Sequence, residues 1–257
     1  MLLRPFERIG NGLLDFAEEV GRVMTIMGRM FVWLPRRPFR LRLLMYQFNF
    51  VGVESAFIVL LTGFFTGAVF SLQSSYAFSL FEANSMVGPT VMLALTRELG
   101  PVLTALMVIG RVGSSMAAEI GTMRVTEQID ALEVLAVNPV HYLIVPRVLA
   151  SVIMMPMLTT VFEAIGALGS WGVTTKLLNV PSIEFIDEVI YYVDFDDFYI
   201  GILKAAVFGL IMAVIGCYQG YYTTRGAEGV GKATTQSVVL SSVTVMVANY
   251  FLTALMF

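Results

Sequence analysis

Charged side chains inside otherwise apolar stretches are the residues of this chain whose types could do chemistry. Arg97 and Glu98 are adjacent, Pro101 follows one helical turn later, and Lys204 lies in a separate apolar stretch. A charge at mid-bilayer costs about 2.5–3.5 kcal/mol on insertion scales, so such residues usually face a cavity or one another. Pro101 removes a backbone donor and can kink the helix toward an interior space. Two hypotheses stay open: mutual pairing that stabilises the bundle, or a polar spot in an apolar cavity that recognises a lipid headgroup.

The longest interior polar gap, residues 121–132, lies between two long apolar stretches. Thr126 can cap a helix whose first turn holds Glu127 and Gln128, which suits the positive end of a helix dipole. We therefore expect a short amphipathic helix over about residues 125–137. Its apolar face would consist of Val125, Ile129, Leu132 and Leu135, and Asn138-Pro139 would end it. A helix this short is marginal alone, so it either packs on its own bundle or docks on a soluble partner, and the residues alone favour neither.

Other patterns resemble functional motifs but lack a part that the chemistry needs. Residues 226–232 fit the spacing of a nucleotide-binding P-loop, yet Ala233 replaces the hydroxyl residue that would bind Mg²⁺, and no strand precedes them. We expect a tight turn there instead, with Thr234 or Thr235 capping the last span. The sole histidine has no Cys or acidic neighbour at metal-ligand spacing, and Ser114 has no base at a readable spacing. Neither a metal site nor an enzymatic role is therefore expected.

The composition is that of a helical membrane protein. Of the 257 residues, 57% are hydrophobic and 14% charged, and the mean hydropathy is +0.79. A soluble globular domain has about 25% charged residues. The net charge of −3 is too close to neutral to indicate nucleic-acid binding, and a single cysteine, Cys217, excludes an intrachain disulfide. Charges throughout the first 30 residues argue against a cleaved signal peptide.

The apolar stretches predict an all-α domain with about five transmembrane helices. The first has a short apolar centre over residues 56–72, which could be re-entrant or extended by its flanks. Gly63 and Gly67 within it form a small-xxx-small pattern that permits close helix contact. The other four are expected at about residues 87–123, 141–178, 198–222 and 238–257. The second and third would be about 55 Å long at ~1.5 Å per residue, well over one bilayer, which predicts a hairpin that projects into water.

The first segment, residues 1–47, is expected to lie at the membrane interface, with the transmembrane domain over 48–257. Apolar residues recur there at helical spacing, eight arginines fall between Arg4 and Arg42, and residues 35–38 form a Pro-Arg-Arg-Pro turn. This pattern is typical of one or two amphipathic helices with arginines at the headgroups. The alternative is a solvated amphipathic tail.

The distribution of basic residues predicts the orientation. Lys and Arg mark the cytoplasmic side of a membrane protein. They gather in the N-terminal segment, around the polar gap and between the last two spans, whereas the loop after the first span and the acidic loop at about 179–197 have none. We therefore expect a cytoplasmic N-terminus, an external C-terminus and a cytoplasmic polar gap.

Residues 110–132, GRVGSSMAAEIGTMRVTEQIDAL, closely resemble the signature of the MlaE/YrbE-type permeases. These are membrane subunits of ABC transporters that move phospholipids or other hydrophobic molecules. Further matches are RELGPVL at 97–103, NPVHYL at 138–143 and GAEGVGKATT at 226–235, in order and at matching spacing from about residue 50 to the end. Ile120 stands where leucine is usual, a substitution of like for like.

The resemblance implies that the helix at about 125–137 is a coupling helix, seated in a groove of a cytosolic ATPase. The residues that it assigns to this contact are Thr126, Glu127, Gln128, Ile129, Asp130 and Leu132, with Ile129 and Leu132 filling apolar hollows of the partner. It also implies a homodimer of this chain, two ATPase copies that bind ATP and Mg²⁺, a periplasmic MCE-domain protein and a small STAS-domain accessory. No cofactor on this chain and no nucleic acid are expected.

The resemblance further implies that Arg97, Glu98 and Lys204 lie at the substrate cavity, since the matching Arg-Glu of the family does. Candidates for the apolar cavity wall are Phe70, Leu72, Tyr76 and Phe78, which could equally be packing or lipid-facing residues. Three other charged residues are expected at the interface: Glu54, Glu163 and Lys176.

The function expected from the resemblance is phospholipid movement between a bacterial inner membrane and a periplasmic carrier, supporting outer-membrane lipid asymmetry. The alternative is a self-sufficient secondary transporter, in which the three charged residues form an ion or proton relay. A secondary transporter has no need of a helix that docks on an ATPase.

Overall fold

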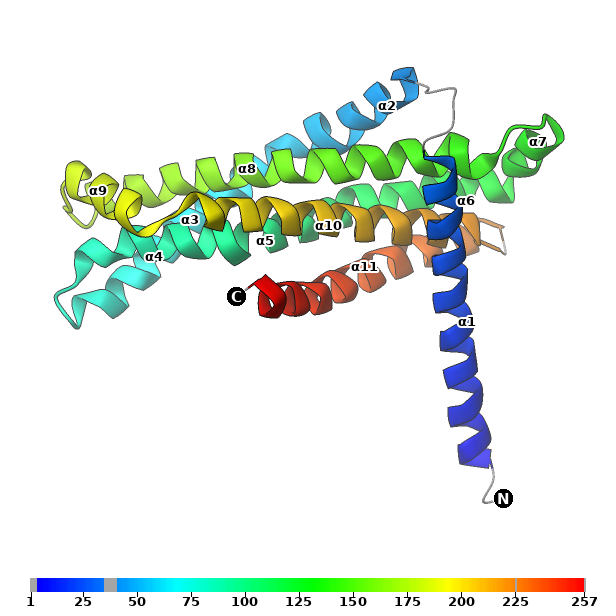
Figure 1. Ribbon diagram of the computed structural model, residues 1–257, viewed down its shortest axis with the longest axis horizontal. Helices are drawn as coiled ribbons and strands as arrows, with labels where there is room; N and C mark the ends of the chain where they lie inside the picture. Colours follow the sequence, from blue (N-terminus) through cyan, green and yellow to red (C-terminus); the bar gives the residue numbers. More distant parts are fainter. Residues whose placement is uncertain (1–3, 35–40, 225, 257) are drawn as a thin grey trace.

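The computed structural model describes residues 4–34, 41–224 and 226–256, and every element in this part of the chain is a helix (Figure 1). The side chains of residues 4–13 and 15–17 lie outside the description. The α-helices are α1 (Arg4–Trp33), α2 (Leu41–Phe48), α3 (Glu54–Ser79), α4 (Val87–Ala94), α5 (Gly100–Val108), α6 (Ser114–Val125), α7 (Gln128–Val134), α8 (Val145–Lys176), α9 (Ser182–Tyr192), α10 (Phe195–Tyr221) and α11 (Gly226–Met256). Short 3₁₀ or π turns, η1 to η5, join some of them.

The prediction of an all-α membrane protein is confirmed, because five helical runs of the described residues are long and apolar enough to cross a membrane. They are Leu41–Ser79, Asn84–Val125, Val140–Lys176, Phe195–Tyr221 and Gly226–Met256. The first run is extended by its flanks to 39 residues, so the short apolar centre is no re-entrant loop. The second run has 42 residues, about 63 Å at 1.5 Å per residue, which is twice the ~30 Å of a bilayer core.

Small residues hold α3 against α8 at backbone distance. A Cβ on Gly63 would lie 2.8 Å from the Phe162 carbonyl oxygen, and one on Gly67 would overlap the Gly166 carbonyl. Farther along, the Ser71 hydroxyl donates to Ser170 Oγ at 2.7 Å. The small-xxx-small pattern of the first span therefore marks a real helix contact, in which close approach replaces the hydrophobic drive that lipid does not supply.

Four π-turns interrupt the spans in the described part of the chain. They are η1 (Asn49–Val53), η3 (Leu95–Leu99), η4 (Ile109–Gly113) and η5 (Val140–Ile144). Such π-turns are rare and frequently occur at functional sites. Two of them carry three of the five charged residues of the second span: η3 holds Arg97 and Glu98, and η4 holds Arg111, which forms an ion pair with Glu54 of α3.

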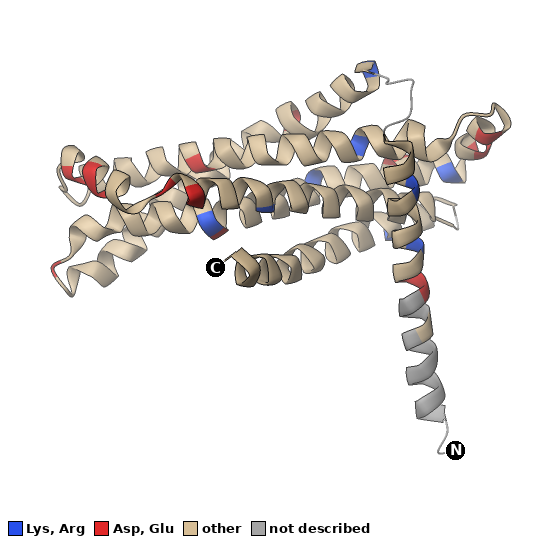
Figure 2. Ribbon diagram, in the orientation of Figure 1, with Lys and Arg blue, Asp and Glu red and all other residues tan. Residues whose placement is uncertain are grey.

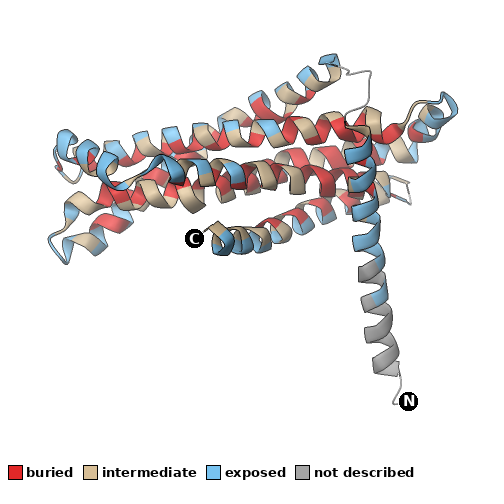
Figure 3. Ribbon diagram, viewed as in Figure 1, coloured by how far each residue is buried: buried red, intermediate tan, exposed pale blue. Residues whose placement is uncertain are grey.

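Burial differs sharply between the last two spans (Figure 3). In α10, 61% of the residues in the most apolar 18-residue stretch are buried, against 11% in α11. The helix α10 lies between α8 and α6, whereas α11 packs on the bundle along one side only. Val243, Val247 and Phe251 are among the large apolar side chains that α11 leaves exposed.

The helix α1 crosses the end of the bundle that carries α7, at a steep angle to the spans (Figure 1). Its second half packs there through Ile26 and Met30, which are buried, and through Trp33, whose ring lies 5.7 Å from that of His141. Met24 on the same helix is 57% exposed. This placement is compatible with the expected interfacial position; the Pro-Arg-Arg-Pro turn lies outside the described residues.

The helices of the structure differ at three places from the expected bounds. The boundary at residue 47 falls inside the continuous run Leu41–Ser79. The acidic segment 179–197 is mostly helical, since it contains α9 and the start of α10. The last span begins at Gly226 in a left-handed conformation (φ +64°), and the hydroxyls of Thr234 and Thr235 bond the Gly231 carbonyl inside the helix rather than capping it.

Candidate functional site

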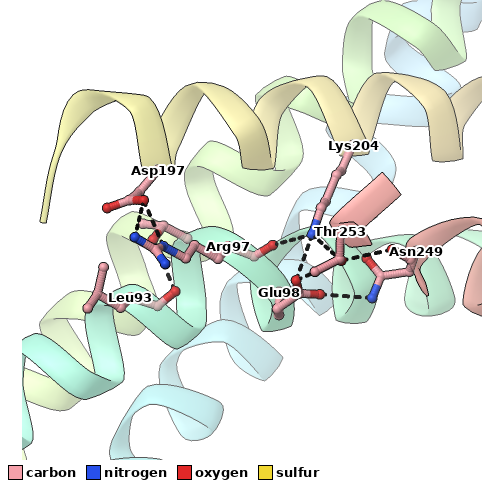
Figure 4. A network of polar contacts seen from close by, with 8 residues as sticks. Leu93, Arg97, Glu98, Asp197, Lys204, Asn249 and Thr253 are labelled. Atoms are coloured by element: carbon pink, nitrogen blue, oxygen red, sulfur yellow. Dashed lines mark hydrogen bonds and ion pairs between the residues drawn. The ribbon is translucent and has the colours of Figure 1, made fainter. Parts of the chain in front are cut away.

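Lys204 of α10 is fully buried and forms an ion pair with Glu98 of η3 at 2.7 Å, in the middle of the bundle (Figure 4). Its ammonium also donates to the Arg97 carbonyl and to Thr253 Oγ1, each at 2.9 Å. An ammonium has three N–H groups, and all three are used. This is how the fold accepts a buried lysine, because a buried charge is tolerated only when it is paired and hydrogen-bonded.

Pro101 explains why the Arg97 carbonyl needs Lys204. In a regular helix the N–H of residue 101 would bond the carbonyl of residue 97, and proline has no N–H. The π-turn η3 immediately precedes this position. Pro101 was expected to open this part of the helix toward the interior. In the structure, the Arg97 carbonyl, which Pro101 cannot serve as a donor, accepts a hydrogen bond from Lys204.

Arg97 points away from Lys204 and pairs with Asp197 in the first turn of α10. Its Nε and Nη2 lie 2.7 and 2.6 Å from Asp197 Oδ1. The other oxygen, Asp197 Oδ2, accepts from the backbone N–H of Asp194 at 3.1 Å in a capping box that starts α10. The Arg97 side chain is 38% exposed, whereas that of Asp197 is 5% exposed.

Leu99, which directly follows Glu98 in the chain, lines two separate hollows. The first has a volume of about 430 Å³ and is lined by Thr62, Phe65, Thr66, Val69, Phe70, Gln73 and Leu99. The second, of about 370 Å³, is lined by Glu98, Leu99, Val102, Met246, Asn249, Tyr250 and Thr253. Their walls are mainly apolar, with Glu98 at one edge. This arrangement can accommodate a hydrophobic molecule beside a small polar spot.

The apolar wall candidates of the first span fall in different places. Phe70 lines the first hollow and packs on the core. Leu72 and Tyr76 are 46% and 77% exposed, and Phe78 packs on the core nearer the end of α3. Only Phe70 of these four lines either hollow.

The polar gap forms the far tip of the bundle, but its local structure differs from the prediction. The helix α7 spans only Gln128–Val134, and Glu127 precedes it in a left-handed conformation with no side-chain cap. Thr126 does not cap α7, because its hydroxyl donates to the Thr122 carbonyl at the end of α6, 2.8 Å away. Asn138 was expected to end α7, and in the structure it also caps the next span. Its Oδ1 accepts from the N–H groups of Val140 and His141.

The side chains on and beside α7 do not form the single apolar face that the sequence predicts. Ile129 is fully buried in this chain's own core, so it cannot fill a hollow on a partner. Leu132 is half-buried, while Val134 and Leu135 are 87% and 72% exposed. Glu127, Gln128 and Asp130 are exposed, and Asp130 pairs with Arg124 at 2.6 Å. The tip therefore presents a polar edge beside two exposed apolar side chains.

The sequence that builds this bundle, its tip and its charged cluster matches a known family. The model of the MlaE permeases matches residues 44–255. This chain belongs to the MlaE permease family. Its relatives include a probable ABC transporter permease protein of Rickettsia felis, 44% identical over 257 residues, which cover 100% of this chain and 99% of the relative.

Two further relatives of this MlaE permease come from other bacterial groups. A probable ABC transporter permease protein of Synechocystis is 42% identical over 232 residues, which cover 90% of this chain and 88% of the relative. The intermembrane phospholipid transport system permease protein MlaE of Haemophilus influenzae is 37% identical over 258 residues, 100% of this chain and 99% of that protein. Family membership and the five spans identify the chain as a multi-pass transport subunit.

Sequence reasoning missed three partners of the charged cluster in this MlaE permease. Asp197 was assigned to an external loop, and Asn249 and Thr253 lie in the last span without any charge to mark them. Asn249 Nδ2 donates to Glu98 Oε2 at 2.8 Å, and Thr253 Oγ1 donates to Glu98 Oε1 at 2.9 Å. Polar residues one turn apart in an apolar helix, as Asn249 and Thr253 are, were the available signal.

Glu163 corrects another prediction. It was expected near the end of a span, at the interface, but it lies in the middle of α8 and is 2% exposed. Glu163 is therefore a buried carboxyl group beside Gly100 and Gly201, close to the charged cluster.

Proposed function

We propose that this chain is the membrane permease of an ABC transporter that moves phospholipids between a bacterial inner membrane and a periplasmic lipid carrier, supporting outer-membrane lipid asymmetry. The observation that carries the proposal is the charged cluster at the edge of the second hollow, which Glu98 lines and which shares Leu99 with the first hollow. Acyl chains would occupy the apolar walls, and the headgroup would lie beside Glu98, Lys204 and Arg97. The name of the Haemophilus influenzae relative supports phospholipid as the substrate.

A separate ATPase would supply the energy through the tip at α7. In this proposal the ATPase binds ATP and Mg²⁺, and this chain binds neither. Glu127, Gln128 and Asp130 would make its polar contacts, with Leu132, Val134 and Leu135 as the apolar ones. Thr126 and Ile129 would act indirectly, by holding the end of α6 and the base of α7 in place. The names of the relatives as ABC transporter permeases support such a partner.

The assembled transporter would contain two copies of this chain, two ATPases, a periplasmic MCE-domain protein and a small STAS-domain accessory. The exposed apolar face of α11 supports the homodimer, because it borders the second hollow through Met246 and Tyr250. A second copy against this face would enclose the hollow that a single chain leaves open.

Charge distribution supports a cytoplasmic N-terminus and a periplasmic C-terminus. Basic residues lie mainly toward the end that carries α1 and α7, while acidic residues mark the end that carries α9 (Figure 2). Lys and Arg favour the cytoplasmic side, which places the tip where a cytosolic ATPase can reach it. The helix α1 would then lie in the plane of the cytoplasmic leaflet.

The test is ATP-dependent movement of a fluorescent phospholipid in liposomes that contain the permease and the nucleotide-binding subunit that copurifies with it. Glu98→Gln combined with Lys204→Met removes both charges and keeps similar side-chain volumes. We expect lipid movement to fall at least about tenfold, equivalent to about 1.4 kcal/mol, while the ATPase still copurifies. The matched control is Glu18→Gln with Arg22→Met, an exposed ion pair on α1, which should transport normally.

Normal transport by the double variant would remove the charged cluster from the mechanism. Lipid movement by this chain alone, driven by an ion gradient without ATP, would replace the ABC proposal with the secondary transporter.

A further inference from the structure

Glu163 is a carboxyl group without a partner in the middle of the transmembrane bundle. Its side chain is 2% exposed, and neither oxygen has a hydrogen bond to any group that the structure describes. An unpaired ionised carboxylate is very costly in an apolar medium. Something must therefore neutralise or ligate this group.

The packing around Glu163 is built to admit a large polar side chain. Gly100 of α5 and Gly201 of α10 face it: a Cβ on Gly100 would lie 2.9 Å from Glu163 Oε1, and a Cβ on Gly201 would lie 3.4 Å from it. A side chain at either glycine would crowd the carboxyl. Gly201 also lies directly against the Thr96 carbonyl, so the carboxyl is close to the irregular backbone of η3.

Two further buried hydroxyls lie one turn along the same seam. The helices α5 and α10 run opposite to α8, since Gly100 and Gly201 face Glu163 while Gly209 faces Ser151 and Met155. One turn from Glu163 on α8 is Thr159, and one turn from Gly100 on α5 is Thr104, so this register brings the two threonines to the same level of the bundle. Both are fully buried.

Neither threonine hydroxyl bonds any group in the described structure. By contrast, Thr62, Thr96 and Thr160 donate to backbone carbonyls of their own helices, while Thr174 on α8 and Ser241 on α11 are further buried hydroxyls without a partner among the described groups. Four oxygens, two from Glu163 and one from each threonine, are therefore buried and unsatisfied on helices whose register brings them to neighbouring levels of the bundle. Buried polar groups nearly always have a partner, and such exceptions can mark an unobserved water or ion.

Charge balance indicates what occupies the seam. On η3 and α10, the buried or half-buried charges are Arg97, Glu98, Asp197 and Lys204, and they form two ion pairs that sum to zero. The helix α3, which packs along α8, carries Glu54, and this residue pairs with Arg111. α5 has no charged residue, Asp196 is exposed at the start of α10, and Arg147 and Lys176 lie more than three turns away on α8. An ionised Glu163 would therefore be the one uncompensated charge of this region.

We propose that Glu163, Thr159 and Thr104 form a buried site for one monovalent cation, which is either a proton on the carboxyl or a sodium ion held by carboxylate and hydroxyl oxygens. A single positive charge neutralises a single carboxylate, whereas a divalent ion would leave an excess charge and would seek more oxygen ligands than three side chains offer. The site links α5, α8 and α10 and is independent of the transported substrate.

The test uses the purified full chain in detergent, with the cation itself as the probe. The first measurement compares thermal unfolding in NaCl and in choline chloride at equal ionic strength. The second is the infrared carbonyl stretch of a protonated carboxylic acid. Glu163→Gln keeps the shape of the side chain but removes the charge, and Glu184→Gln, an exposed acid on α9, is the matched control.

If sodium is the occupant, NaCl raises the Tm of the wild type by about 3–6 °C at tenfold excess over Kd. Glu163→Gln abolishes this rise, and Glu184→Gln retains it. If a proton is the occupant, sodium has no effect, and the wild type shows a carboxylic-acid band that Glu163→Gln removes.

Thr159→Val and Thr104→Val provide the second test, should Glu163→Gln fail to fold. Each removes one hydroxyl at similar volume and should reduce the sodium effect or shift the acid band. A wild type with neither a sodium effect nor an acid band overturns the proposal. Indifference of both signals to Glu163→Gln, or to both threonine variants, overturns it as well.

Discussion

Lys204 is the residue on which the charged cluster depends, because it joins three spans through one ammonium group. It binds Glu98 and the Arg97 carbonyl of the second span and Thr253 of the last span, while it belongs to α10 itself. One of these acceptors, Glu98, also accepts from Asn249 and Thr253, and its side chain is 37% exposed. The Arg97 carbonyl depends on Lys204 because Pro101 offers it no N–H.

This dependence predicts coupling between Lys204 and Pro101. Lys204→Met should lower stability by about 1–3 kcal/mol, less than a fully buried ion pair would lose, because Glu98 is 37% exposed and keeps Asn249 and Thr253 as donors. Pro101→Ala restores an N–H one turn from the Arg97 carbonyl, so it should cost about 0.5–1.5 kcal/mol less in the Lys204→Met background than in the wild type. A double-mutant cycle of unfolding free energies in detergent measures this difference. Additivity within about 0.5 kcal/mol would mean that the lysine does not replace the missing donor.

At the scale of single residues, the sequence predicted which charged residues form the cluster, but it did not predict which residues they pair with. Arg97, Glu98 and Lys204 do gather, but the side chain of Arg97 carries the same charge as Lys204 and points about 100° away from its neighbour Glu98. Arg97 reaches Asp197 instead. The position of Glu163 was misjudged because hydropathy marks the ends of a span only loosely, and α8 extends 13 residues beyond it to Lys176.

Among the elements, the contact of α3 with α8 is set by residues that have little or no side chain. Gly67 lies against the Gly166 backbone, and Gly169 lies against that of Phe64. Lipid tails are as apolar as leucine, so only closer packing and hydrogen bonds favour this contact over lipid. The serine pair Ser71–Ser170 adds such a bond.

Gly67→Ala should therefore separate the two helices. The added methyl group would overlap a backbone carbonyl, which no side-chain rotation can relieve, and we expect a loss of at least about 1–3 kcal/mol of stability. Gly172→Ala on α8 is the matched control, because a Cβ there meets nothing within 4 Å. It should be neutral or stabilising by up to about 1 kcal/mol from helix propensity. Equal Tm values for the two variants in detergent would refute the close contact as a source of stability.

The existence of the helices could be predicted from apolar length, whereas their irregularities could not. Glu127 and Ala136 adopt left-handed conformations that favour glycine or asparagine, with φ of 58° and 57°. Ala136 ends α7 in a Schellman motif, since its N–H bonds Glu133 and that of Val137 bonds Leu132. Neither position holds a glycine or an asparagine, so no local sequence pattern predicts these conformations.

Across the whole molecule, the charged cluster and the tip lie on one helical run. Val125 lies 28 residues after Arg97 on this run, about 42 Å at 1.5 Å per residue. Arg111 of this run pairs with Glu54 and donates to the Phe50 carbonyl, both in the first span. Glu119 of this run pairs with Arg147 of α8. Displacement of the tip can therefore reach the cluster through a braced helix rather than through loops.

The tip itself predicts the strength of ATPase binding. Val134→Ser with Leu135→Ser removes the two most exposed apolar side chains near α7 and should weaken copurification of the ATPase at least about tenfold, since each buried apolar side chain contributes about 1.5–3 kcal/mol. Leu80 directly follows the last residue of α3 and is similarly exposed. Leu80→Ser should therefore leave copurification of the ATPase unchanged. Retention of the ATPase by the double variant would show that these side chains are no part of the interface.

The two π-turns of the second span have a consequence for comparing this chain with its relatives. A π-turn closes its backbone bond over five residues instead of four, so each one is in effect a single-residue insertion that rotates the rest of the helix by roughly 100°. The span Asn84–Val125 contains two such insertions, η3 and η4, 14 residues apart from Leu95 to Ile109. A homologue that lost one could keep its length in the loops and its apolar composition, yet turn the residues that follow toward different neighbours. Gaps in an alignment of such permeases therefore belong inside membrane helices as well as between them.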